Sequence, residues 1–317
     1  MLHSRRSLLG SAAALAAAAA APALAKAPLA GALAPAYRLK IGEIEVTALS
    51  DGYIDIPLAM FPAHEPGEAV KLLEREYRSA AAPVRSSVNA FVVNTGDKLI
   101  LIDAGTVPGF APSLGRLAGR LAAAGFQPDQ FDMVLTTHLH PDHIGAMTDG
   151  AAARFTKAEL VVAEPELKFW TDEGIASRAP KDFQPFFKMA QGAAAPYAKV
   201  TRTFAKDGEV TKGITSLALP GHTPGHTGYM ISSGADSLLI WGDIVHAPAL
   251  QFARPDWAIG FDNDPAQGIV TRKAIFDRVS ADKILVAGMH LDFPAFGHVS
   301  KDGGGYKFTP AYWRLDQ

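Results

Sequence analysis

The chain has 317 residues, and 48% of them are hydrophobic, which is enough for a large buried core and excludes global disorder. Its formal net charge is −2, and no Lys/Arg-rich run is present, so we expect no nucleic-acid partner and no anionic membrane surface. It contains no cysteine. Disulfides, thiol nucleophiles and thiolate metal sites are therefore excluded, and any metal must be held by histidine and carboxylate.

The N-terminal segment has the pattern of an export signal. Arg5 and Arg6 precede an alanine-rich run that ends in Ala23-Leu24-Ala25, small residues of the kind a signal peptidase accepts. We predict a twin-arginine signal peptide over 1–25, a flexible leader over 26–36 and a periplasmic mature protein without a membrane segment. The alternative is an uncleaved anchor, which alanine disfavours because it partitions into membranes less well than leucine.

The first half of the mature chain is rich in predicted strands. A turn at 94–97 joins the last two into a hairpin, and 112–124 has helical spacing with Gly125 as a stop. A further strand then ends at a histidine-rich loop. The predicted strands are 37–41, 44–50, 89–93, 99–102 and 131–136.

The second half repeats this pattern. Runs 229–234 and 237–243 form another hairpin whose apolar second strand ends at an aspartate, followed by a predicted helix over 266–279 and a strand over 283–287. We predict one α/β (α+β) domain over 37–317, an αββα sandwich of two β-rich halves with helices outside. Apolar hairpins can also resemble one another by chance. Residues 165–200, rich in aromatics and prolines, predict a helical insertion whose aromatics either cover a site or pack the core.

The strongest functional signal is the segment Thr137-His138-Leu139-His140-Pro141-Asp142-His143. His138 and His140 are two residues apart, so on an extended segment both point to the same side. Asp142 and His143 follow after Pro141 turns the chain, so one loop can present ligands to two adjacent metals. A cluster of solvated histidines is the alternative, and further partners downstream argue against it.

Three later residues complete this set of candidate ligands. His222 lies in a Gly/Pro-rich turn after the strand 216–219, Asp243 ends the second hairpin, and His290 follows the strand 283–287. Each therefore stands at the C-terminal end of a strand, where loops of a sheet converge on one edge. A carboxylate at Asp243 can bridge two cations.

The H-x-H-x-D-H loop, the Gly-His turn, the Gly-Asp pair and the late histidine resemble the metallo-β-lactamase superfamily, in particular its methyl parathion hydrolases and related lactonases. The resemblance implies a ligand set in which His138, His140 and His222 hold one metal and Asp243 bridges to the second. It also implies that Asp142, His143 and His290 complete that second site, and that the protein forms a homodimer. The stretches that carry the resemblance are 47–52, 114–117, 137–144, 221–227, 296–299 and 305–308.

Two divalent ions, most simply Zn²⁺, suit such a donor set, although iron, manganese and cobalt remain open. The resemblance also implies hydrolysis, since a glutamate in place of His140 would indicate a redox di-iron protein. Two cations that share a water lower its pKa from ~15.7 towards ~7, which supplies a bridging hydroxide at neutral pH. Asp142 is the candidate catalytic residue that orients this hydroxide or moves a proton.

The expected substrate is a small neutral ester, an organophosphate triester or a lactone. Resemblance points to an aromatic substrate pocket, to which His246 adds a polar group. A β-lactamase or thioesterase is the alternative, but these usually offer a basic group to an anionic substrate, and the motif loops contain no Lys or Arg. A non-catalytic periplasmic metal-binding protein is a further alternative, disfavoured by the complete ligand set. The predicted pocket residues are Phe110, Trp170, Phe186, Phe187 and His246.

The remaining polar residues near these motifs have weaker assignments. His226 and His298 are candidates for supporting or structural roles. Asp51 and Asp103 are expected to tie loops beneath the site rather than to bind metal.

Overall fold

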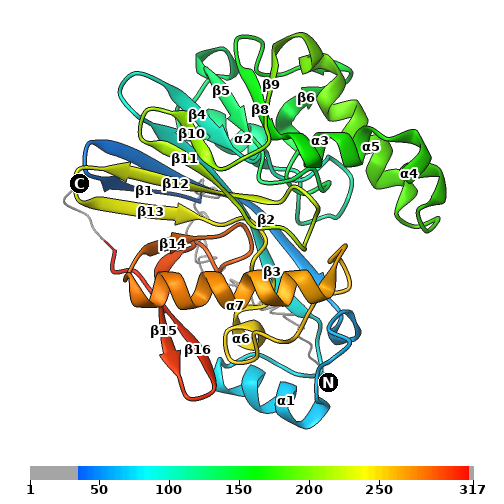
Figure 1. Ribbon diagram of the computed structural model, residues 1–317, viewed down its shortest axis with the longest axis vertical. Coiled ribbons are helices and arrows are strands. Elements are labelled where there is room, and N and C mark those ends of the chain that lie inside the picture. The colour runs from blue at the N-terminus through cyan, green and yellow to red at the C-terminus, as the bar shows by residue number, and fades with distance from the viewer. Residues whose placement is uncertain (1–34, 314–317) are drawn as a thin grey trace, which may run out of the picture. The chain divides into compact units, whose positions relative to one another are not determined.

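Two seven-stranded β-sheets pack face to face in the part of the chain that the computed structural model describes, residues 35–313 (Figure 1). The predicted signal peptide over 1–25 and nearly all of the predicted leader over 26–36 lie outside the described residues, as do residues 314–317. Within residues 35–313, none of the helices combines the length and the apolar character that a membrane crossing requires.

The first sheet comes from the first half of the described chain. Its strands are antiparallel from β1 to β4 and parallel from β4 to β9. Strand β2 is longer than predicted and continues to Ile56 beside β3, which is also longer than predicted. In sheet order the strands are β1 (Ala36–Ile41), β2 (Ile44–Ile56), β3 (Val84–Asn94), β4 (Leu99–Ile102), β5 (Met133–Leu135), β8 (Glu159–Ala163) and β9 (Thr201–Phe204).

The second sheet comes from the second half, and among its pairings only β13 with β14 is parallel. The hairpin β12–β13 followed by parallel β14 matches the hairpin β3–β4 followed by parallel β5, so the predicted echo between the halves is confirmed. In sheet order the strands are β10 (Gly208–Thr211), β11 (Ile214–Ala218), β12 (Thr227–Ser233), β13 (Asp236–Ile240), β14 (Leu285–Ala287), β15 (Phe296–Asp302) and β16 (Gly305–Pro310). A separate two-stranded pair consists of β6 (Thr148–Asp149) and β7 (Ala152–Ala153).

Alternate side chains of the first sheet enter two different cores. Phe91 and Val93 on β3 join the core between the sheets, whereas Ala90 and Val92 join the core beneath the outer helices. A strand that is buried on both faces reads as a continuous apolar run, which explains why residues 90–93 of β3 and the whole of β4 lack polar alternation. The predicted αββα sandwich is thereby confirmed.

Helices cover the outer faces of this sandwich (Figure 1). Buried residues of α2, α3 and α5 pack on the first sheet, and those of α7 pack in the core of the second. The insertion predicted over 165–200 is helical, as expected. The helices are α1 (Pro66–Arg75), α2 (Leu117–Ala123), α3 (Glu164–Thr171), α4 (Glu173–Arg178), α5 (Gln184–Ala194), α6 (Pro248–Gln251) and α7 (Pro265–Ala281), with 3₁₀ turns at Leu58–Met60, Pro128–Gln130, Gly145–Met147 and Ala195–Val200.

The helix predicted over 112–124 begins later, at Leu117. The Asp51 carboxylate accepts the backbone N–H groups of Gly115, Arg116 and Leu117 at 2.9, 2.6 and 2.7 Å. These donors lie at the start of the helix and need an outside acceptor, and a residue distant in sequence supplies it. Asp51 also accepts the N–H of Thr106 at 2.9 Å, so the prediction that it ties loops together is confirmed.

Candidate metal centre

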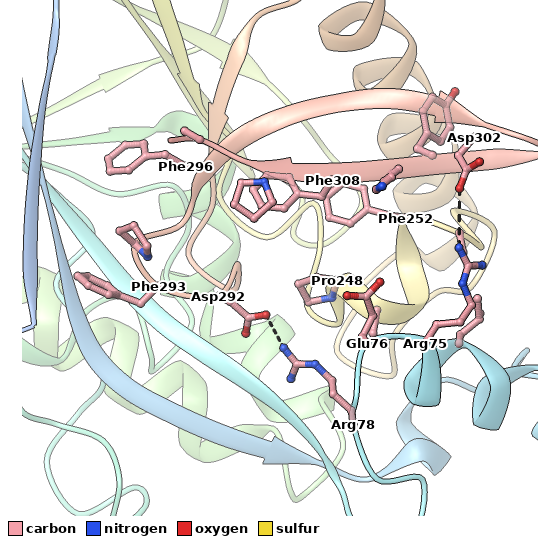
Figure 2. A pocket seen from close by; sticks show the side chains of 18 of the residues that line it. Arg75, Glu76, Arg78, Pro248, Phe252, Asp292, Phe293, Phe296, Asp302 and Phe308 are labelled. Atoms are coloured by element: carbon pink, nitrogen blue, oxygen red, sulfur yellow. Dashed lines mark hydrogen bonds and ion pairs between the residues drawn. The ribbon is translucent and has the colours of Figure 1, made fainter. Parts of the chain in front are cut away.

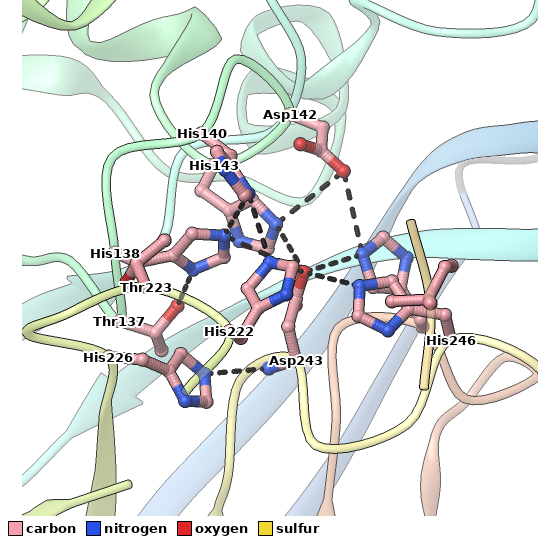
Figure 3. A network of polar contacts seen from close by, with 12 residues as sticks. Thr137, His138, His140, Asp142, His143, His222, Thr223, His226, Asp243 and His246 are labelled. Carbon is pink, nitrogen blue, oxygen red and sulfur yellow. Dashed lines mark hydrogen bonds and ion pairs between the residues drawn. The ribbon is translucent and has the colours of Figure 1, made fainter. Parts of the chain in front are cut away.

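The seven predicted ligands converge where four strand-ending loops meet (Figure 3). Strands with buried residues end here, and the first ligand follows each of them within four residues, so the loops carry the ligands to one edge of the sandwich. The contributing segments are the loop after β5 with His138, His140, Asp142 and His143, the turn after β11 with His222, the segment after β13 with Asp243, and the segment after β14 with His290.

One group consists of three imidazoles and a carboxylate, all buried. His140 Nδ1 lies 3.0 Å from His138 Nε2 and 2.9 Å from His222 Nε2. Asp243 Oδ2 lies 3.6 Å from His138 Nε2 and 3.2 Å from His222 Nε2. Four donor atoms therefore surround one point.

The second group adjoins the first and shares Asp243. Asp142 Oδ2 lies 3.5 Å from the Nε2 atoms of both His143 and His290. Asp243 Oδ2 lies 3.4 Å from His143 Nε2 and 3.1 Å from His290 Nε2. A single carboxylate oxygen thus faces both groups, which is the geometry of a bridging ligand.

The outward nitrogens of the imidazoles show which inward atoms carry lone pairs. A carboxylate or carbonyl oxygen can only accept, so the Nδ1 that faces it holds a proton, and in the neutral ring Nε2 then carries the lone pair. His143 Nε2 and Asp243 Oδ1 are buried without a hydrogen-bond partner among the described residues. Converging lone pairs repel one another unless a cation lies between them, so this donor set fits metal ions. The outward partners are Asp103 for His143 (2.7 Å), Asp262 for His222 (2.9 Å) and the Ser87 carbonyl for His290 (2.7 Å).

The two carboxylates of the centre carry negative charge at neutral pH. Burial acts to raise the pKa values of Asp142 and Asp243, but the surrounding imidazoles outweigh it and lower both. Burial also acts to lower the pKa of His222, while hydrogen bonds with Asp243 and Asp262 outweigh it and raise that pKa to about 9. The site therefore favours positive charge at its centre.

Two further histidines lie at this centre. His246 Nε2 is 3.1 Å from Asp243 Oδ2, and its ring stacks on His290 with centroids 4.8 Å apart, so it belongs to the polar cluster itself. His226 Nε2 accepts the backbone N–H of Asp243 at 2.9 Å, and its Nδ1 donates to the Leu219 carbonyl at 2.8 Å. His226 thus holds the backbone of Asp243, whereas His298 is exposed on β15.

A small cavity opens over the two groups. Of the predicted pocket residues, Phe110, Phe186 and His246 line it, and the lining described here includes no Lys or Arg. Trp170 and Phe187 instead line a neighbouring apolar groove, where Trp170 is only 1% exposed and packs edge-on to His140 with centroids 5.3 Å apart. Residues that the sequence did not single out also line the metal-facing cavity, namely Ile54, Ile56 and Phe261.

The sequence also missed the polar groups that hold the ligand loops. Asn89 Nδ2 donates to the carbonyls of Met289 and Leu291 on either side of His290, at 2.9 and 2.7 Å. Asp262 and Glu166 play comparable parts around His222. They stand outside any motif and meet the site only through long-range contacts, so no local pattern marks them.

A second, more polar groove lies between α1, α6 and the β15–β16 hairpin (Figure 2). It contains the ion pairs Arg78–Asp292 and Arg75–Asp302, the latter at 3.9 Å. None of the seven candidate ligands lines it. The histidine-rich centre is therefore the candidate functional site.

A sequence model described as the metallo-beta-lactamase superfamily matches residues 83–286, which include six of the seven candidate ligands. The chain belongs to this superfamily. It is a metal-dependent hydrolase of the superfamily's αββα type, as its solved relatives are.

Relatives within the superfamily include lactonases. An N-acyl homoserine lactonase of Bacillus cereus is 24% identical over 199 residues, 62% of this chain and 67% of the relative. N-acyl homoserine lactonase AttM of Agrobacterium fabrum is 31% identical over 118 residues, 35% of this chain and 40% of the relative.

Two solved structures match nearly the whole chain. The hydrolase AbOPH of the beta lactamase superfamily is 33% identical, with a TM-score of 0.84 over 90% of this chain and 100% of that one. AidC, described as a dizinc quorum-quenching lactonase in complex with a product, is 26% identical, with a TM-score of 0.83 over 89% of this chain and 99% of that one.

Proposed function

We propose that the chain hydrolyses lactones at a centre of two divalent metal ions. The observation that carries the proposal is the pair of ligand groups that share Asp243 Oδ2 beneath a cavity whose lining is half apolar side chains and half histidines and aspartates of the centre. A neutral cyclic ester suits a cavity without a Lys or Arg in its described lining. The lactonases among the relatives support the same substrate class.

In this proposal His138, His140 and His222 hold one ion, and Asp142, His143 and His290 hold the other. Asp243 contacts both. Zinc is the metal we propose, because imidazole and carboxylate donors suit it and because AidC is described as a dizinc enzyme. When bound, such ions acidify water and polarise a carbonyl oxygen.

Asp142 is the residue we assign to proton handling. Its side chain is 20% exposed, against 2% for that of Asp243, so it is the more open of the two carboxylates. Asp142 Oδ2 faces His143 and His290, which leaves Oδ1 to orient the attacking water, to take the proton that this water loses, and to pass that proton to the leaving alkoxide. His246, beside Asp243 at the cavity, is placed to contact the substrate's polar group.

Aryl phosphotriesters are the second candidate substrates. The apolar groove that Trp170 and Phe187 line lies beside the metal-facing cavity, and Phe261 lines both. This groove provides an apolar surface for an aryl leaving group. β-Lactams and thioesters with an anionic group suit the site less well, because the cavity has no Lys or Arg in its described lining.

A substrate panel tests the proposal. Protein loaded with two equivalents of zinc is assayed with an N-acyl homoserine lactone, an aromatic lactone, a paraoxon-type triester and a β-lactam. We expect the highest kcat/KM for one of the lactones and the lowest for the β-lactam. A preference for the β-lactam, or no turnover of any lactone, contradicts the proposal.

We further propose that residues 1–25 direct folded protein to the periplasm, as the Arg5-Arg6 pattern predicts. The homodimer stays a prediction from the family resemblance, and sedimentation of the purified protein tests it.

A further inference from the structure

Glu166 on α3 is a fully buried carboxylate with both oxygens occupied. Oε1 accepts the backbone N–H of Leu139 at 2.9 Å and the indole N–H of Trp170 at 2.6 Å. Oε2 accepts the Thr223 hydroxyl at 2.7 Å and the backbone N–H of Gly225 at 3.0 Å. Burial raises the pKa of Glu166, and these four hydrogen bonds oppose that rise.

The donors that meet at Glu166 lie beside the ligands of one metal group only. Leu139 stands between His138 and His140, and Thr223 directly follows His222. The imidazoles of the other group have different partners, since His143 bonds to Asp103 and His290 to the Ser87 carbonyl. One carboxylate thus joins the two loops that carry all three histidines of the first group.

Close packing brings α3 onto the His222 turn. A Cβ atom added to Gly225 would lie 2.3 Å from the backbone nitrogen of Glu166, so only glycine allows this approach. Trp170, one turn further along α3, donates to the same carboxylate and packs against His140. The aromatic groove and the first ligand group are therefore connected through a single side chain.

We propose that Glu166 is a positioning residue for the metal ion held by His138, His140 and His222. This inference rests on the dinuclear centre of the proposed function. The two oxygens of the Glu166 carboxylate accept hydrogen bonds from all four donors. The amide of a glutamine has an NH₂ group in place of one oxygen, and this NH₂ group would face two other donors. Loss of a group that holds metal ligands in place through hydrogen bonds typically weakens metal binding 10–100-fold.

Zinc titration of the metal-free protein against a chromophoric chelator tests the proposal without substrate. For Glu166→Gln we expect one of the two zinc affinities to fall about 10–100-fold and the other to stay within about threefold. Asp142→Asn removes a ligand of the second group, so the strong zinc affinity that remains in this variant belongs to the first group. Adding Glu166→Gln to it should lower that remaining affinity. Glu164→Gln is the matched control, because it makes the same change in the same helix at a half-exposed carboxylate paired with Lys168.

Wild-type affinities in Glu166→Gln, or an equal loss at both sites, overturn the proposal. If Glu166→Gln does not fold, Thr223→Val decides, because it removes one donor to Oε2 and leaves the carboxylate in place. It should weaken the same site selectively, and unchanged affinities refute the inference. Failure of the proposed function is separable: wild-type protein that binds only one zinc contradicts the dinuclear centre, and two bound zincs without lactone turnover contradict only the substrate.

Discussion

Asp243→Asn is the substitution that tests the shared ligand most directly. Asp243 Oδ2 lies 3.1–3.6 Å from the Nε2 atoms of five histidines, so this one oxygen is the common point of both ligand groups. Asparagine keeps the shape of the side chain and removes its charge. The backbone N–H of residue 243 still has His226 as its acceptor, so we expect the fold to persist.

The size of the effect follows from the charge that is lost. At a ligand distance of about 2 Å, a unit charge attracts a divalent ion by roughly 4 kcal/mol even in fully water-like dielectric. That energy corresponds to about 10³-fold in metal affinity. Burial of Asp243 weakens the screening of its charge, while the cost of taking that charge out of water acts in the opposite direction, so about 10³-fold is the order of magnitude for each ion.

Elemental analysis after dialysis against a chelator measures the outcome, together with kcat/KM for the best lactone. We expect one zinc or less per chain and at least a 10²-fold loss of activity, with an unchanged circular dichroism spectrum. Asp149→Asn is the matched control, since its side chain is 78% exposed and forms an ion pair with Arg154 outside the ligand groups. Near-normal metal content together with near-normal turnover in Asp243→Asn would refute the reasoning.

Three other predictions concern the metals, the aromatic groove and export. Zinc-replete protein should hold close to two ions per chain by elemental analysis, and chelation should abolish activity that zinc or cobalt restores; activity that persists without metal contradicts this. Trp170→Ala should lower kcat/KM for aryl phosphotriesters and aromatic lactones at least tenfold more than for a small aliphatic ester, because loss of the buried indole reshapes the apolar groove, which aromatic substrates fill and a small ester does not. It should also destabilise the fold by about 3–5 kcal/mol, and equal losses on all substrates would show that Trp170 only packs the core. Arg5→Lys with Arg6→Lys should leave precursor in the cytoplasm, and unchanged periplasmic activity would contradict the signal assignment.

The sequence alone determined the donor set and its order along the chain. The spacing of His138, His140, Asp142 and His143 is local, and a loop that follows a short buried strand can bring them together without knowledge of the rest. The apolar runs that end at Asp243 and before His290 are equally local signals. Strands with both faces buried are continuous apolar segments, so the two-sheet architecture could be predicted as well.

Only the tertiary structure decided which groups orient these ligands and which side chains reach the cavity. Asp262 hydrogen-bonds to His222, and Glu166 hydrogen-bonds to Thr223 and Gly225 beside it, from segments far away in sequence, and no periodicity encodes such contacts. The start of α2 likewise depends on a residue distant in sequence. Asp51 on β2 accepts the backbone N–H of Leu117, in place of a capping side chain next to the helix. Trp170 lies in the neighbouring groove rather than in the metal-facing cavity, because the direction of a side chain depends on how α3 packs on the sheet, which residue spacing does not specify.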